Sequence, residues 1–158
     1  MKISTEIEGI SMHVGEERAI EYIAKAGFDA CATPDDFNAH LDAVSSEYFV
    51  ACLDIGHAEM RGSNTTAAEM IRALGNRLQA LHIHDNDKHY DLHQIPFSCS
   101  IDFEAVIKAL REIGYSGELT MEACDYFKAF NKDNVYDGIV DLARAARKLA
   151  DMYDGRPE

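Results

Sequence analysis

Residues 48–57 read YFVACLDIGH, and this stretch decides the fold. Its first six residues, Tyr48 to Leu53, are a continuous apolar run without a period, which is typical of a β-strand buried on both faces. Strands of this kind occur in parallel sheets that are covered by helices on both sides. The run ends in Asp54, so the sequence predicts a buried parallel strand with a carboxylate at its carboxyl end.

Short β-like runs alternate with amphipathic segments along the rest of the chain. The expected strands are 2–8, 48–53, 78–83 and 118–121, with a short remnant near 28–32. The expected helices are about 15–26, 34–44, 66–74, 102–113 and 135–153. This alternation predicts an α/β fold with parallel strands.

The length limits which α/β fold is available. The chain has 158 residues, of which 47% are hydrophobic and 27% are charged, the composition of a globular domain. A complete eight-unit (β/α) barrel usually needs about 250 residues. We therefore expect one domain over 1–158, built as a partial (truncated) TIM-type barrel of about five strand-helix units.

Charge and hydropathy exclude several partners. Fifteen Lys and Arg against 28 Asp and Glu give a net charge of −13, which would repel a phosphate backbone, so we expect no nucleic-acid partner. No apolar stretch approaches the roughly 18 residues of a membrane span, and 1–6 lack the apolar core of a secretory signal. We expect a cytoplasmic protein without a membrane partner. Its four cysteines form no CxxC pair and are expected to be free thiols.

Side chains that bind metals stand at the ends of three expected strands. Asp54, His82 and Glu122 each close such a run, and the carboxyl ends of parallel strands share one rim. The full set of candidate metal ligands is Asp54, His57, His82, Asp91, His93 and Glu122. Mixed Asp, His and Glu ligands suit Mn²⁺, Zn²⁺ or Co²⁺. Such a cation would polarise a carbonyl or hydroxyl oxygen and stabilise an enediolate, or else acidify a water.

Other polar residues of the same region have simpler interpretations. His84 and His89 are interpreted as hydrogen-bonded structural histidines. His84 lies two residues after His82, so both side chains point to the same face if the strand continues. The alternative interpretation is that His84 contacts a metal-binding residue or the substrate. Asp85, Asp87 and Lys88 are interpreted as a solvated turn, and Gly56 would let the backbone pass close to a ligand.

Several motifs together resemble one family. They are LDIGHA at 53–58, LHIHDN at 81–86, DLH at 91–93, IDF at 101–103, and IGYSG at 113–117 followed by Met121-Glu122. In order and spacing they resemble the carboxyl-terminal half of the sugar phosphate isomerase/epimerase family. That family belongs to the xylose isomerase-like barrels, together with the endonuclease IV type of apurinic-site nuclease. The resemblance spans about 33–122, and 2–27 resembles the family's first strand and helix.

The resemblance implies a role for each candidate residue. In the single-metal isomerases and epimerases, the residues matching Asp54, His82 and Glu122 bind the metal, and the one matching His57 contacts substrate. Glu122 would also be the base that moves a proton between adjacent carbons of a small sugar or sugar phosphate. In the nuclease branch, the residues matching Asp91 and His93 bind zinc as well.

The sequence also departs from this family. Four strand units normally separate the first strand from the strand that bears the residue matching Asp54, and here we expect them to be missing between about 28 and 33. A Glu on the fourth strand, which is a metal ligand and the second acid/base of the isomerases, is absent with them. Pro96-Phe97-Ser98-Cys99 stands where the family has Pro-Gly-x-Gly.

A partial barrel leaves open sheet edges and an apolar interior, so we expect a homodimer or a higher homo-oligomer. Two alternatives to a metal-dependent isomerase or epimerase remain open. One is a non-catalytic, self-associating remnant of the family that still binds metal. The other is a phosphodiesterase like the apurinic-site nucleases, which Asp91 and His93 support and the charge of −13 opposes.

Overall fold

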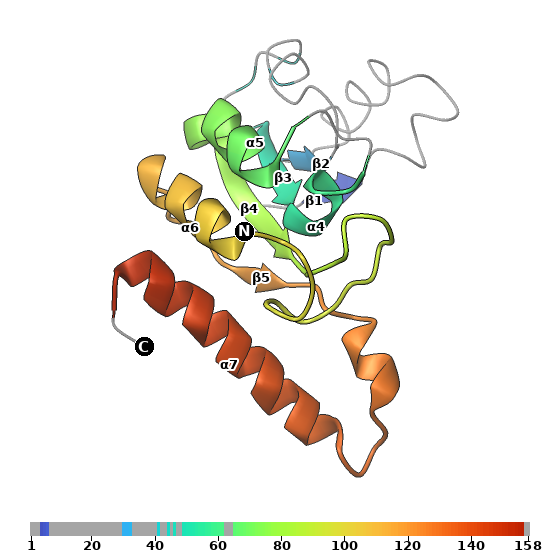
Figure 1. The fold of residues 1–158 in the computed structure, drawn as a ribbon. Coiled ribbons are helices and arrows are strands. Elements are labelled where there is room, and N and C mark those ends of the chain that lie inside the picture. Colours follow the sequence, from blue (N-terminus) through green and yellow to red (C-terminus); the bar gives the residue numbers. More distant parts are fainter. Residues whose placement is uncertain are drawn as a thin grey trace, which may run out of the picture.

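A computed structural model of the chain describes residues 4–6, 30–32, 41, 44, 46, 49–61 and 65–156. Within these residues one parallel sheet has its strands in chain order, from β1 to β5 (Figure 1). The strands are β1 (Ser4–Glu6), β2 (Ala30–Ala32), β3 (Val50–Asp54), β4 (Leu78–Ile83) and β5 (Thr120–Met121). Sequential parallel order is the order of a (β/α) barrel, so the expected five-unit partial barrel is confirmed.

Helices follow the strands where the periodicity predicts them. They are α4 (Ile55–Ala58), α5 (Ala67–Leu74), α6 (Phe103–Glu112) and α7 (Val135–Asp154), with 3-10 turns η1 (Gly75–Arg77) and η2 (Tyr126–Ala129). The expected helices near 66–74, 102–113 and 135–153 are confirmed. The expected helix 15–26 and most of 34–44 lie outside the described residues.

Two of these helices begin at well-formed caps. The Thr66 hydroxyl accepts the Glu69 N–H, and the Glu69 carboxylate accepts the Thr66 N–H, which together make a capping box at α5. At α6 the Asp102 carboxylate accepts the Ala105 N–H at 3.0 Å. Such caps satisfy N–H groups that have no partner inside the helix, so each helix has a defined start.

The core lies between the sheet and the paired helices α5 and α6, which lie side by side (Figure 1). In β3, Val50 to Leu53 are all buried, as the apolar run predicts, and Leu81 of β4 is fully buried. The sheet and both helices contribute the core side chains, among them Leu53, Ile71, Leu81, Ile83, Phe103, Ile107 and Leu110. Because β3 and β4 are held in the core, the positions of their carboxyl ends are also defined.

Helix α7 is packed much less closely. Among its side chains Leu149 is fully buried, whereas Tyr136 is 72% exposed and Ile139 is 50% exposed. The Tyr153 hydroxyl donates a hydrogen bond to the Tyr115 carbonyl, which ties the end of α7 to the core. The apolar stripe of this helix is therefore covered at its carboxyl end, while its amino-terminal part stays exposed. No helix among the described residues is long and apolar enough to cross a bilayer.

Candidate metal centre

Strand pairing brings three predicted ligands to one edge of the sheet. Asp54 at the end of β3 is in register with His82 of β4, which is in register with Thr120 of β5. The N–H of Glu122 donates to the Ile83 carbonyl at 2.9 Å, so Glu122 directly continues the β4–β5 ladder. The carboxyl ends of the three strands thus place Asp54, His82 and Glu122 side by side.

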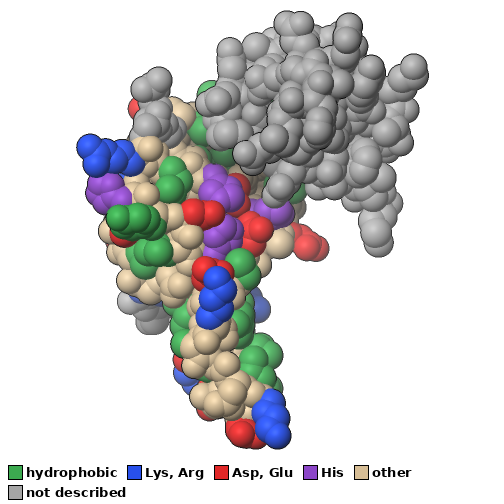
Figure 2. Space-filling view, turned by 90° about the vertical axis from the view of Figure 1, so that its right-hand side faces the viewer, with side chains coloured by type: hydrophobic (Ala, Val, Ile, Leu, Met, Phe, Trp, Pro, Cys, Tyr) green, Lys and Arg blue, Asp and Glu red, His purple; other side chains and the backbone are tan. Residues whose placement is uncertain are grey.

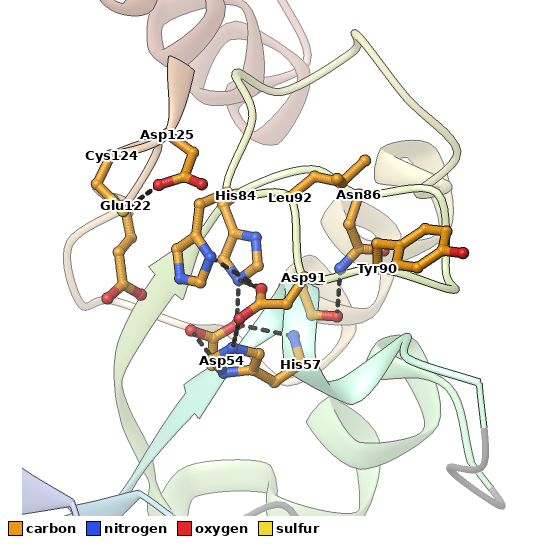
Figure 3. Close-up of polar contacts among 12 residues, drawn as sticks. Asp54, His57, His84, Asn86, Tyr90, Asp91, Leu92, Glu122, Cys124 and Asp125 are labelled. Carbon is orange, nitrogen blue, oxygen red and sulfur yellow. Dashed lines mark hydrogen bonds and ion pairs between the residues drawn. The ribbon is translucent and has the colours of Figure 1, made fainter. Parts of the chain in front are cut away.

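Asp54 is the residue around which the site is arranged (Figure 3). Its Oδ1 accepts the His57 N–H at 2.9 Å, which caps the short helix α4, and its Oδ2 lies 3.3 Å from His57 Nδ1. The same Oδ1 lies 3.0 Å from Nε2 of His84. Burial opposes ionisation of Asp54, but the His84 ring and the His57 N–H outweigh it and hold the pKa of this carboxyl well below its usual range. Asp54 is therefore a carboxylate at neutral pH.

His84 is fully buried. Its ring is stacked on His93, with the centroids 3.9 Å apart, and it lies against Gly56, where a Cβ would come 2.0 Å from the ring. Its Nε2 lies 3.0 Å from Asp54 Oδ1, so the buried ring has a carboxylate partner, as expected for a hydrogen-bonded histidine. Gly56 does permit a close approach, but the group that approaches is His84.

His82 and Glu122 form the outer side of the site. His82 Nδ1 lies 3.0 Å from Glu122 Oε2 and 3.9 Å from Asp54 Oδ2, and the His82 side chain is 41% exposed. Oε2 of Glu122 is buried and lacks a well-aligned hydrogen-bond partner. Burial and the neighbouring Asp54 carboxylate raise the pKa of Glu122. This glutamate is thus a better proton acceptor than an ordinary surface carboxylate, because its conjugate acid is weaker.

The loop after β4 contributes a second set of ligand-type groups. Nε2 of His57 lies 3.1 Å from Asp91 Oδ2, and Nδ1 of His93 lies 2.8 Å from Asp91 Oδ1. Asp91 and His93 come from this loop and His57 comes from α4, so 34 residues separate His57 from Asp91 in the sequence. The tertiary structure brings them together beside His84 (Figure 3).

The two sets share one residue. Ligand atoms of Asp54, His84 and Glu122 lie within 4.8 Å of one another, and so do those of His57, His84, Asp91 and His93. Figure 2 shows histidine side chains gathered among carboxylates on one face of the molecule. Mixed imidazole and carboxylate donors this close together fit a divalent cation such as Mn²⁺, Zn²⁺ or Co²⁺. His82 is adjacent to these sets, and His84 belongs to both.

Two buried polar residues hold the loop in place. The Asp85 carboxylate accepts N–H groups from Asn86, Cys99 and Ile101 at 2.8–3.1 Å, and the Asn86 side-chain amide donates to the Gly56 carbonyl at 2.8 Å. Both residues are fully buried, so the interpretation of Asp85 as part of a solvated turn is wrong. The sequence offers no signal for this, since a solvated Asp-Asn pair would look the same.

The turn at Pro96-Phe97-Ser98-Cys99 keeps a conformation that glycine usually provides. Phe97 has a φ of 72°, in the left-handed region. Its ring packs on Phe103 at 5.2 Å between centroids, and Lys148 Nζ lies 4.7 Å from its centroid. Contacts of the Phe97 ring thus offset the backbone cost, which is of order 1–3 kcal/mol.

A parallel sheet in chain order with ligand-type side chains at its carboxyl edge defines a (β/α)-barrel-type protein with a candidate metal centre. The chain belongs to the xylose isomerase-like TIM barrel family, because residues 14–146 match that family. Over 90 residues it is 30% identical to an uncharacterised protein of Methanocaldococcus jannaschii, covering 57% of this chain and 31% of that protein. Over 78 residues it is 35% identical to an uncharacterised protein of Sinorhizobium fredii, covering 49% of this chain and 24% of that protein.

Solved structures of sugar epimerases have the same fold. A D-allulose 3-epimerase from Methylomonas sp. in complex with D-allulose aligns at a TM-score of 0.57 and 21% identity, over 89% of this chain and 52% of its own. An L-ribulose 3-epimerase aligns at a TM-score of 0.59 and 17% identity, over 88% of this chain and 52% of its own. A 3-keto-D-glucoside 4-epimerase from E. coli aligns at a TM-score of 0.58 and 18% identity, over 82% of this chain and 51% of its own. The chain therefore spans about half of each structure and 31% or less of the curated relatives.

Proposed function

We propose that this protein is a metal-dependent isomerase or epimerase of a small sugar or sugar phosphate. The observation that carries the proposal is the edge of the sheet where ligand atoms of Asp54, His84 and Glu122 lie within 4.8 Å of one another. Membership of the xylose isomerase-like family and the fold shared with sugar epimerases support it. A divalent cation bound here would supply Lewis-acid polarisation of the sugar's carbonyl and hydroxyl oxygens.

Each residue of the site has a separate task in this proposal. Asp54, His82 and Glu122 hold the cation, as the family resemblance implies, and His84 joins them because its Nε2 lies 3.0 Å from Asp54. The carboxylate of Asp54 supplies the negative charge, since its pKa is lowered. The side chains of His57, Asp91 and His93 provide a second group that binds either a further cation or the hydroxyl groups of substrate.

Glu122 is the proposed base. Its raised pKa suits removal of a proton from the carbon next to a carbonyl, which leaves an enediolate on the sugar. Delivery of a proton from water to the opposite face of the same carbon, with Glu122 keeping the one it removed, gives the epimer, and return of the proton from Glu122 to the neighbouring carbon gives the isomer. His57 is 44% exposed beside Asp54 and can donate a hydrogen bond to the sugar.

The proposed enzyme would act as a shortened barrel. We propose that the chain forms one domain in which the units between about 28 and 33 are missing, and that it self-associates across its open sheet edges. Direct pairing of β2 with both β1 and β3 supports this arrangement, because a single short strand then replaces the missing units. Water, Glu6 or Glu8 of the first strand, or a partner chain would have to supply the ligand that the missing fourth strand provides in the family.

The second candidate is a non-catalytic, metal-binding remnant of the family. The chain spans about half of the epimerase structures, so walls that surround the sugar in a full barrel are reduced, which favours this candidate. A nuclease-like phosphodiesterase is favoured by the second ligand group around Asp91 and opposed by the net charge of −13.

Metal content and proton exchange test the proposal together. Elemental analysis of the purified protein should find at least one divalent metal per chain, and Asp54→Asn should lose it. In D₂O, NMR should then detect deuterium entering a ketose next to its carbonyl, in a panel of ketoses and their phosphates that includes D-allulose. Glu122→Gln should slow this exchange by about 100-fold or more, because a positioned base contributes about 10²–10⁴-fold.

Glu104→Gln is the matched control, since Glu104 lies in the first turn of α6, away from the site, and loses the same charge. This variant should keep both metal and exchange. Bound metal without exchange on any sugar would establish the non-catalytic remnant, and cleavage of an abasic oligonucleotide would establish the phosphodiesterase. Absence of metal from the wild-type protein after loading would refute all three.

A further inference from the structure

The two faces of the sheet are covered to different degrees. Leu81 and Ile83 of β4 are fully buried in the core that the sheet forms with α5 and α6. His82 lies between them in the strand and therefore points to the opposite face. Its neighbours in register are Asp54 on β3 and Thr120 on β5. Exposure rises along this row, from 12% for the Asp54 side chain to 41% for His82, and Thr120 is exposed. The second face is thus increasingly open toward β5, whereas parallel sheets are almost always covered on both faces.

The sheet also ends in two unpaired edge strands. Within the part of the chain that the structure describes, β5 pairs only with β4, and β1 pairs only with β2. In a complete (β/α) barrel the last strand pairs in parallel with the first, so that no edge remains. Here β1 and β5 are the opposite edges of one five-stranded sheet. Each edge can therefore accept a further parallel strand through its free N–H and C=O groups.

We propose that a second copy of this chain closes the barrel, with β5 of each copy paired in parallel with β1 of the other. One twofold axis along the barrel relates the two contacts, and all strands of both copies then end at the same rim. A second copy fits better than an unrelated strand because it places β1 beside β5, which is the order of a closed barrel, and covers both edges at once. The ring of ten strands is wider than the usual one of eight, since barrel diameter grows with strand number.

This pairing brings a further carboxylate to the candidate metal centre, a consequence that rests on the proposed function. Glu6 is the last residue of β1, and Glu122 directly continues β5 along its ladder with β4. Paired strands lie about 4.8 Å apart, so the partner's Glu6 stands beside Glu122 at the rim. Within one chain, by contrast, β2 to β4 separate β1 from β5. The partner's Glu6 thus supplies the metal ligand that the missing fourth strand provides in the family, and each dimer has two shared sites.

Sedimentation velocity of the full chain tests the dimer itself. The wild-type protein should be dimeric at about 10 µM, because two pairs of strands and the covered sheet face make an interface of at least standard size. The dimer should persist at about 1 M salt, since backbone pairing and apolar burial are little affected by screening. A wild-type protein that is monomeric at about 100 µM would overturn the proposal.

Mixed dimers test whether the two chains share the metal centre. One chain carries Glu6→Gln and the other carries Glu122→Gln, and co-expression with two different affinity tags isolates the mixed dimer. Each variant alone should lose most of its divalent metal in elemental analysis. In the mixed dimer one of the two sites combines the intact Glu122 of one chain with the intact Glu6 of the other. The mixed dimer should therefore regain about half of the wild-type metal content.

The matched control is the mixed dimer of Asp54→Asn with Glu122→Gln. One chain supplies both of these ligands to a site, so neither site of this dimer is intact and no metal should return. A mixed dimer of Glu6→Gln with Glu122→Gln that stays empty would overturn the proposal, and so would a Glu6→Gln protein that keeps its metal. A monomeric protein that binds metal overturns this proposal alone. A dimeric wild-type protein without metal overturns the proposed function, and the ligand role of Glu6 with it.

Discussion

The carboxyl edge of the sheet and helix α7 hold their polar side chains in opposite ways. At the edge, buried strands and a buried loop fix Asp54 and His84, and His84 is fully enclosed. Along α7 the charged groups are exposed, and Leu149 is the one large apolar side chain that the described structure buries fully. In the first region burial holds the polar side chains in one arrangement. In the second most side chains are exposed and contribute little to the core.

The sheet and α7 should differ most in how much stability they lose when an apolar side chain is removed. Leu81→Ala at the centre of the sheet should lower the free energy of unfolding by about 2–5 kcal/mol, because Leu81 is fully buried and a cavity would remain. Ile139→Ala on α7 should cost less than about 1 kcal/mol, since that side chain is half exposed. Urea unfolding followed by circular dichroism measures both. Equal losses would mean that α7 is packed as closely as the sheet.

Replacing a glycine by alanine in each region tests the same difference in packing between the sheet edge and α7. Gly56→Ala should lower the free energy of unfolding by about 3 kcal/mol and reduce metal binding, because the new Cβ would come 2.0–2.5 Å from atoms of the His84 ring. At Gly138 of α7 a Cβ would come 3.0–3.2 Å from the Phe127 and Phe130 rings, and alanine favours a helix by about 1 kcal/mol.

Gly138→Ala should therefore change stability by less than about 1 kcal/mol and leave metal binding intact. Thermal unfolding and metal titration of the two variants measure the effects. A Gly56→Ala protein that binds metal like the wild type would show that His84 can leave its place without consequence for the site.

The smallest of the three effects compares two carboxylates. Asp85→Asn should cost about 1–3 kcal/mol, because the buried carboxylate accepts three N–H groups and an amide turns one acceptor oxygen into a donor. Asp141→Asn on α7 loses an exposed pair with Arg144 and should cost less than about 0.5 kcal/mol. Urea unfolding of both variants measures these two losses of stability. A near-neutral Asp85→Asn would mean that other contacts hold the loop.

The fold could be predicted from the sequence because its signals are local. The apolar run from Tyr48 to Leu53 alone predicts a buried strand. Capping residues and hydrophobic periodicity predict the helices near 66–74 and 102–113. The convergence of Asp54, His82 and Glu122 followed from one general rule, that parallel strands end at a shared edge. Their roles in binding metal and substrate stay predictions.

The environment of His84 could not be predicted. One residue separates His82 from His84, yet His82 is partly exposed and His84 is fully buried between Gly56 and His93. Burial of His84 depends on the loop that carries His93 folding back over the end of β4. That loop is held by Asp85 and Asn86 through contacts that span 14–30 residues, which no local pattern contains.

The sequence by itself determined a parallel α/β architecture of about five units, its membership of a barrel family and the strand ends that carry ligand-type residues. The architecture and the strand ends depend on hydrophobic period, capping and spacing, which act over a few residues, and the family follows from the resemblance of several motifs. Only the tertiary structure decided that His84 joins two ligand groups and that Tyr136 and Ile139 of α7 are exposed. Both depend on which distant segments pack against a residue, and packing is a property of the whole chain.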